Sequence, residues 1–153
     1  KHMLKKISFI FALFLFLSSC GYSPMYSKKN GQNLNIEITE YEGDSKLNSV
    51  IRSKFRIYGD ETARLFKIKI NTSYQKTDLS KDSTGKVDRY QLNAIAIFDI
   101  SSVDFNETIT LTEEIYMKNF ADDFEEKNHE NKVKDDFAIS ISRKLIIQLL
   151  KVK

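Results

Sequence analysis

Only one of the 153 residues is a cysteine, Cys20, so the chain holds no partner for an internal disulfide bond. Long apolar segments are also missing. The longest apolar run extends from Ile7 to Leu17, which is shorter than the roughly 20 residues that a bilayer-spanning helix needs. The sequence therefore excludes a disulfide-stabilised domain, and it argues against a chain built around membrane-spanning helices.

Charge of one sign is not in excess. The formal net charge of +3 comes from three lysines that precede Cys20, and the rest of the chain is formally neutral, which argues against nucleic acid as a partner. Charge is nevertheless uneven, because residues 64–91 hold seven basic and three acidic residues, whereas residues 104–136 hold four basic and eleven acidic ones. The basic segment 64–91 is expected to face an anionic partner. The alternative is that both segments are ordinary solvated faces of strands and a helix.

Residue types that serve catalysis are scarce. His129 is the only histidine after Cys20, and it lies in a highly charged stretch where an exposed helical position is expected. There is no nucleophile–base combination and no glycine-rich phosphate loop. Adjacent carboxylates such as Asp122 and Asp123 point apart on a helix or strand, which makes them poor metal ligands. We therefore expect neither an enzyme nor a cofactor or metal site.

Residues 1–19 have the organisation of a bacterial lipoprotein signal peptide. Lys5 and Lys6 precede the apolar run, and Ser18 and Ser19 place small side chains directly before Cys20. This pattern predicts cleavage before Cys20, acylation of its thiol, and a lipidated tether over residues 20–33. The alternatives are an uncleaved membrane anchor, or an ordinary signal peptide that cysteine follows by coincidence.

Hydrophobic periodicity predicts a single α+β domain over residues 34–153. Alternating apolar residues predict strands at 34–40, 64–74, 90–100 and 107–117, and the polar stretch 76–86 is expected to be a hairpin loop. Helical spacing predicts one helix from its cap at Asp44 to Gly59, and a second that contains Val133 to Leu149. We expect the order β-α-β-β-β-α, a two-layer sandwich with both helices on one face of a mostly antiparallel four-stranded sheet.

The predicted strand at 90–100 is apolar on both faces in its middle. Leu92 to Ile100 alternate toward one side, while Ile95 and Ile97 point to the other. This pattern is typical of a central strand, or of a strand whose outer face meets a partner.

Three stretches carry a resemblance to a known family. They are Cys20-Gly21-Tyr22-Ser23-Pro24-Met25-Tyr26, Asp88-Arg89-Tyr90-Gln91-Leu92, and Asn119-Phe120-Ala121 followed by a helix ending in Ile141-Ser142-Arg143-Lys144-Leu145. Together with the acylation site and the order of elements, they resemble the LPS-assembly lipoprotein family (LptE) of alphaproteobacterial type. Ser23 and Met25 depart from the family pattern, which weakens transfer of single residues but leaves the fold expectation intact.

The resemblance implies an outer-membrane lipoprotein on the periplasmic side. It would plug the large β-barrel LptD and assist lipopolysaccharide transport and assembly. Family members are expected to contact lipopolysaccharide through basic residues near one end of the sheet, and by position the candidates here are Lys76, Lys81, Lys86 and Arg89. The alternative is a lipid-anchored periplasmic binding or structural subunit of another envelope complex.

Overall fold

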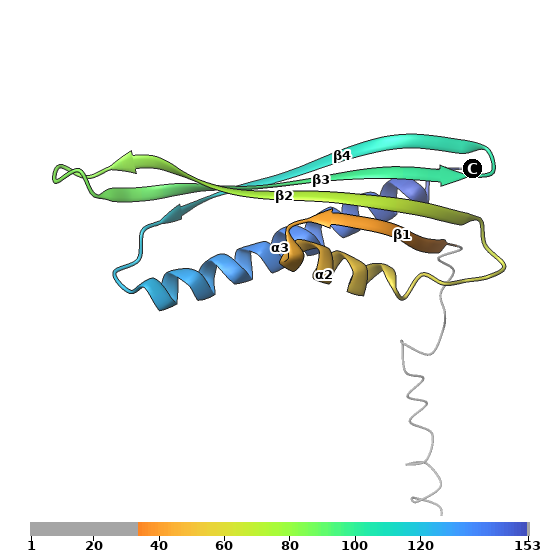
Figure 1. Ribbon diagram of the computed structural model, residues 1–153, viewed down its shortest axis with the longest axis horizontal. Helices are drawn as coiled ribbons and strands as arrows, with labels where there is room; N and C mark the ends of the chain where they lie inside the picture. Colours follow the sequence, from red (N-terminus) through yellow and green to blue (C-terminus); the bar gives the residue numbers. More distant parts are fainter. Residues whose placement is uncertain (1–33, 153) are drawn as a thin grey trace, which may run out of the picture. The chain divides into compact units, whose positions relative to one another are not determined.

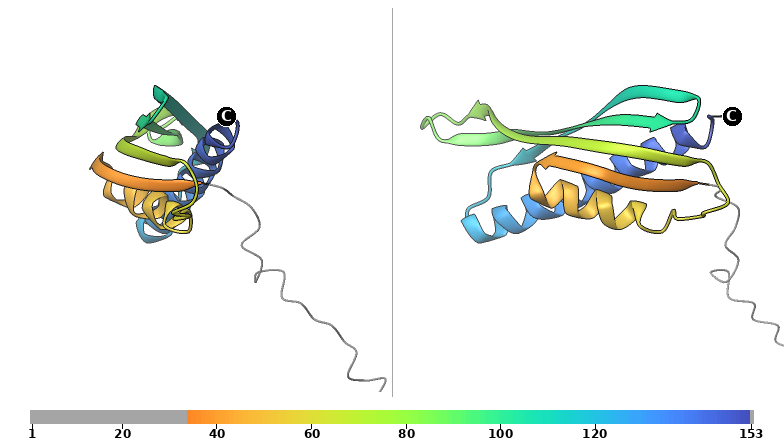
Figure 2. Two further views of the ribbon diagram at one scale, coloured as in Figure 1. Left: turned by 90° about the vertical axis from the view of Figure 1, so that its right-hand side faces the viewer. Right: turned by 45° about the vertical axis from the view of Figure 1, so that its right-hand side comes forward.

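A computed structural model describes residues 34–152, all of which lie in one compact unit. The strand β1 pairs in parallel with β2, while β2, β3 and β4 form an antiparallel meander in the order β1-β2-β3-β4. Both helices lie on the same face of this sheet (Figures 1 and 2). The predicted order of elements and the two-layer α+β arrangement are confirmed. The elements are β1 (Asn35–Gly43), α2 (Ser45–Phe55), β2 (Leu65–Lys81), β3 (Val87–Ser102), β4 (Phe105–Lys118) and α3 (Asp123–Leu149).

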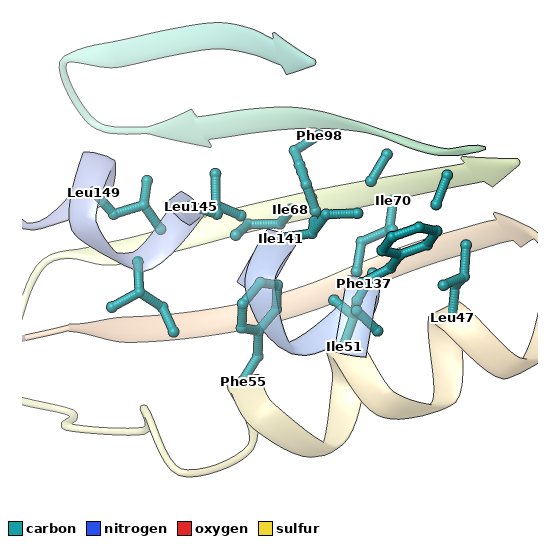
Figure 3. Packing of buried hydrophobic residues seen from close by; sticks show 14 of the residues in the cluster. Leu47, Ile51, Phe55, Ile68, Ile70, Phe98, Phe137, Ile141, Leu145 and Leu149 are labelled. Atoms are coloured by element: carbon teal, nitrogen blue, oxygen red, sulfur yellow. The ribbon is translucent and has the colours of Figure 1, made fainter. Parts of the chain in front are cut away.

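One hydrophobic core fills the space between the sheet and the two helices (Figure 3). Because successive strand residues point to opposite faces, only every second side chain of β2 and β3 reaches this core. The sheet contributes Phe66, Ile68, Ile70, Leu92, Ala94, Ala96, Phe98 and Ile100, and the helices contribute Leu47, Ile51, Phe55, Val133, Phe137, Ile141, Leu145 and Leu149. The intervening strand residues face away from the helices.

The first helix begins where the sequence predicts and ends earlier. The carboxylate Oδ1 of Asp44 accepts hydrogen bonds from the N–H groups of Lys46 (3.0 Å) and Leu47 (2.9 Å), which caps α2. The helix ends at Phe55 with Arg56 as its cap. Gly59 is not the C-terminal glycine that we expected, because it forms an antiparallel bridge to β1 and lacks the positive φ of such a cap.

The hairpin between β2 and β3 is longer than the sequence predicts. The polar stretch 76–86, expected to be a loop, continues β2 as far as Lys81, and only residues 82–86 turn. The Oδ1 atom of Asp82 organises this turn by accepting from the N–H groups of Thr84 (2.8 Å) and Lys86 (3.0 Å). Polar composition was misleading here because pairing with β3 satisfies the backbone of these residues whatever their side chains are.

The second helix also extends further than its apolar periodicity. It begins at Asp123, within the acidic stretch, because Oδ1 of Asp122 accepts from the N–H groups of Phe124 (2.8 Å) and Glu125 (2.9 Å). Within residues 34–152, no helix combines the length and apolar character that crossing a membrane requires.

Candidate functional site

The sheet face turned away from the helices is the larger candidate surface, and we call it the open face. It consists of the alternate residues of β2, β3 and β4 that do not enter the core. Short neutral polar side chains dominate its centre, and those of β4 are exposed throughout. Its central members are Asn71, Ser73, Gln75 and Thr77 of β2, Asn93, Ile95 and Ile97 of β3, and Thr108, Thr110 and Thr112 of β4.

Two isoleucines interrupt the polar character of the open face. The strand β3 lies between β2 and β4, which confirms the central position predicted from its apolar pattern. Ile97 is nevertheless 37% exposed, and in the sheet it stands between Asn71 and Thr110. The part of the chain that the structure describes therefore leaves an apolar spot in the middle of a polar surface.

A depression of about 570 Å³ lies at one end of the open face, where β1, β2, β3 and β4 all contribute. Two of the five charged side chains that line it form an ion pair, and a third accepts a hydrogen bond. The ammonium of Lys69 is 2.9 Å from Oε1 of Glu40, which raises the pKa of that lysine, and the hydroxyl of Thr108 donates to Oδ1 of Asp99 (2.6 Å). Lys67 and Glu107 also line the depression, which therefore presents charges of both signs.

The opposite end of the sheet carries the basic residues singled out from the sequence. Lys81 and Lys86 flank the turn and are exposed, and Arg89 projects from the open face with its Nε 3.5 Å from Oδ2 of Asp88. The register of β3 with β4 brings Lys118 directly opposite Arg89. Lys118 was missed in the sequence because it lies in a segment rich in acidic residues. Pairing the residues of the two strands one by one, outward from the turn after Ser102, would have placed Lys118 opposite Arg89.

Lys76 does not join the other three candidates. It lies on the helix-facing side of β2, where its ammonium is 2.5 Å from Oε1 of Glu126 and 3.2 Å from Oε2 of Glu130. The same ammonium sits 4.2 Å from the centre of the Tyr90 ring. Burial alone would lower the pKa of Lys76, but the hydrogen bonds to both carboxylates outweigh it and raise the pKa. The structure therefore places Lys76, a charged lysine held by two carboxylates, on the opposite sheet face from Arg89.

The remaining sequence candidates add no further chemistry. His129 is exposed, and its ring lies 5.2 Å from that of Phe120. Residues 34–152 contain no group of three or more histidine, cysteine, aspartate or glutamate residues that could hold a metal ion. Cys20 lies outside the described residues, so its lipidation stays a prediction.

Comparison with solved structures identifies the architecture. Rare lipoprotein B from Shewanella oneidensis superposes with a TM-score of 0.53 at 14% identity, covering 74% of this chain and 93% of that one. A lipoprotein from Caulobacter crescentus CB15 gives 0.54 at 11% identity, covering 78% and 90%. The chain has the fold of these lipoproteins. Lipoprotein B from Nitrosomonas europaea agrees, with a TM-score of 0.50 at 14% identity and coverage of 76% and 83%.

These similarities are confined to structure. No protein-family model matches the sequence, and no curated protein matches it either. At identities of 11–14% the rare lipoprotein B fold supports the expected arrangement of strands and helices, while ligands and partners cannot be carried over from it.

Proposed function

We propose that this protein is an outer-membrane lipoprotein of LptE type, without enzymatic activity, that occupies the lumen of a large LptD-type β-barrel and assists lipopolysaccharide transport and assembly. The observation that carries the proposal is the open face. The interior of an outer-membrane barrel is polar, so a plug needs a surface of hydrogen-bonding side chains rather than an apolar one. The threonine, serine and amide side chains of β2, β3 and β4 supply such a surface.

Two further observations support the proposal. The fold is shared with lipoproteins of known structure, which agrees with the lipoprotein signal pattern that ends at Cys20. Two of the three stretches that resemble LptE lie in the described part of the chain. Asp88 to Leu92 begins near the end of the sheet that carries Lys81, Lys86 and Arg89, which we call the basic hairpin end, and Asn119 to Ala121 connects β4 to α3. Lipid attachment at Cys20 would hold the domain at the periplasmic side of the outer membrane.

Purification of the full-length protein from its native envelope in mild detergent tests the proposal. We expect a large β-barrel protein to co-purify in equimolar amount. Thr110→Glu, in the middle of the open face, should reduce recovery of the barrel at least about tenfold, because an unpaired charge would be buried against the lumen wall. Asn128→Glu introduces the same charge at an exposed position of α3 and serves as the matched control.

Two results would overturn the proposal. One is recovery of a different envelope complex in place of a barrel, which would favour a lipid-anchored subunit of that complex. The other is an equal loss of the barrel in the Thr110 and Asn128 variants, which would show that the open face is not the contact surface.

The basic hairpin end is the proposed contact for lipopolysaccharide phosphates, because charge-assisted hydrogen bonds to phosphate oxygens are stronger than neutral ones. Replacing Lys76, Lys81, Lys86 and Arg89 together by alanine should weaken binding of labelled lipopolysaccharide about tenfold. Lys76→Ala alone should change binding little, because its ammonium is already paired with two carboxylates.

The matched control lies at the opposite end of β2. Lys67 and Lys69 are exposed lysines of the open face, and replacing both by alanine removes positive charge at a distance from the hairpin end. Unchanged lipopolysaccharide binding in the fourfold variant, or an equal loss in the control, would rule out this assignment.

A further inference from the structure

The N-terminal part of α3 is held on the sheet differently from the rest of that helix. Buried residues of α3 begin at Val133 and continue to Leu149. From Asp123 to Lys132 no side chain is buried, and only Glu126 and Glu130 are partly covered. This segment is about 15 Å long at the rise of an α-helix, and it contributes nothing to the hydrophobic core.

A single lysine makes the ion pairs that hold this segment to the strands. Lys76 of β2 contacts the carboxylates of Glu126 (2.5 Å) and Glu130 (3.2 Å), which lie one turn apart on the same side of the helix. Glu130 also interacts with the hydroxyl of Tyr74 in β2. In the connection before the segment, the N–H of Phe120 donates to Oε2 of Glu126 (3.3 Å) and the Phe120 ring lies against His129.

The chain is fixed on both sides of this segment. After it, the ammonium of Lys134 is 3.0 Å from Oδ2 of Asp44 and 3.9 Å from the centre of the Tyr74 ring. Before it, the side-chain amide of Asn119 donates to the carbonyl of Val87 (2.8 Å). A helix segment pinned at both ends cannot swing away as a rigid body, so it can leave the sheet only by unwinding locally.

We propose that Asp123–Lys132 is a charge-held lid that opens by local unwinding while the core stays folded, and that Lys76 is its latch. Opening separates the ammonium of Lys76, which lies over the Tyr90 ring, from both carboxylates. The charge of Lys76, which the two carboxylates compensate while the lid is closed, is then no longer compensated. The lid is independent of the proposed function.

Hydrogen exchange of the folded protein, read residue by residue, tests the lid. Lys76→Met keeps most of the apolar stem and removes the charge, so amides of residues 127–132 should exchange about 10- to 100-fold faster. In the wild type their exchange should depend less on urea than that of residues 138–149, because a local opening exposes less surface than global unfolding. Residues 127–132 are the reporters because the first N–H groups of a helix lack intrahelical partners in any case. Replacing Glu126 and Glu130 together by glutamine should reproduce the effect with Lys76 intact.

The matched control is Lys69→Met, which removes an exposed lysine and its ion pair with Glu40 on the opposite face of the same strand. This variant should leave the exchange of residues 127–132 unchanged, because exposed ion pairs contribute little. In the wild type, added salt should accelerate exchange of the lid by screening the ion pairs, and in Lys76→Met this dependence on salt should disappear.

Three results would overturn the proposal. The first is an unchanged exchange rate of residues 127–132 in Lys76→Met. The second is equal protection and equal urea dependence of residues 127–132 and 138–149 in the wild type, which would indicate that the segment opens only together with the whole domain. The third is a salt dependence that persists in Lys76→Met, which would show that other charges hold the segment.

Discussion

Replacing Gly43 by alanine is expected to destabilise the domain by about 2–4 kcal/mol. Gly43 ends β1 with φ 96°, a conformation that side chains rarely adopt. A Cβ atom at this position would lie 1.7 Å from the carbonyl oxygen of Thr72 on the neighbouring strand. One of the two strands would have to shift.

Neither strand can shift freely at this point. The N–H of Asp44 donates to the carbonyl of Thr72 (3.1 Å), so separating the strands also disturbs the residue that caps α2. Thr72 is only 2% exposed, and its hydroxyl lies 3.1 Å from Oδ1 of the buried Asn48. The strain would therefore spread to the end of β1, the cap of α2 and the β1–β2 pairing.

Urea denaturation of the folded domain measures this effect as a lowered midpoint. Gly59→Ala is the control, because a Cβ at Gly59 meets no atom within 4 Å and the residue lacks a positive φ. It should stay within about 0.5 kcal/mol of the wild type. Equal midpoints for the two variants would contradict the close approach of Gly43 to Thr72.

Phe98→Ala is expected to cost about 3–5 kcal/mol of the free energy of unfolding. Phe98 is 0% exposed in the central strand β3, and its ring centre lies 6.2 Å from that of Phe55 in α2. Truncation would leave a cavity between the sheet and the helix, at a place where strands fixed by their ladders on both sides cannot collapse to fill it.

The neighbouring residue supplies the control. Ile97 directly precedes Phe98 in β3, but its side chain points to the open face, where it is 37% exposed. Ile97→Ala should therefore lower the free energy of unfolding by less than about 1 kcal/mol. Thermal or urea unfolding of the two variants, Phe98→Ala and Ile97→Ala, shows which face of β3 packs against the helices. A larger loss for Ile97→Ala would mean that the helices cover the other face.

The predicted strands and helices agree with the structure wherever a strong periodic pattern coincides with burial. Leu92 to Ile100 alternate without interruption, and every core-facing member of that run is buried. Asp44 was recognised as a cap because its effect is local, reaching only two or three residues along the chain. The errors fall where local composition and long-range pairing disagree, as in the stretch 76–86 and at Gly59.

The candidate binding residues were harder to group from the sequence. Lys76 pairs with Glu126 and Glu130, which are 50 and 54 residues away along the chain. The register also shifts between Asp78 and Ser80 and again at Lys81, so counting alternate residues from Lys76 does not reveal the faces that Lys81 and Lys86 occupy. Lys118 became a neighbour of Arg89 only through the pairing of β4 with β3.

The sequence by itself determined the order of elements, the residues that form the core and the cap of the first helix, because periodicity and capping act over a few residues. It also supplied the lipoprotein pattern around Cys20. Only the tertiary structure decided how far the hairpin extends and that the open face is polar. It also decided that Lys76 lies beneath α3, on the opposite sheet face from Arg89. These features depend on strand register and on contacts between distant segments, which no local pattern encodes.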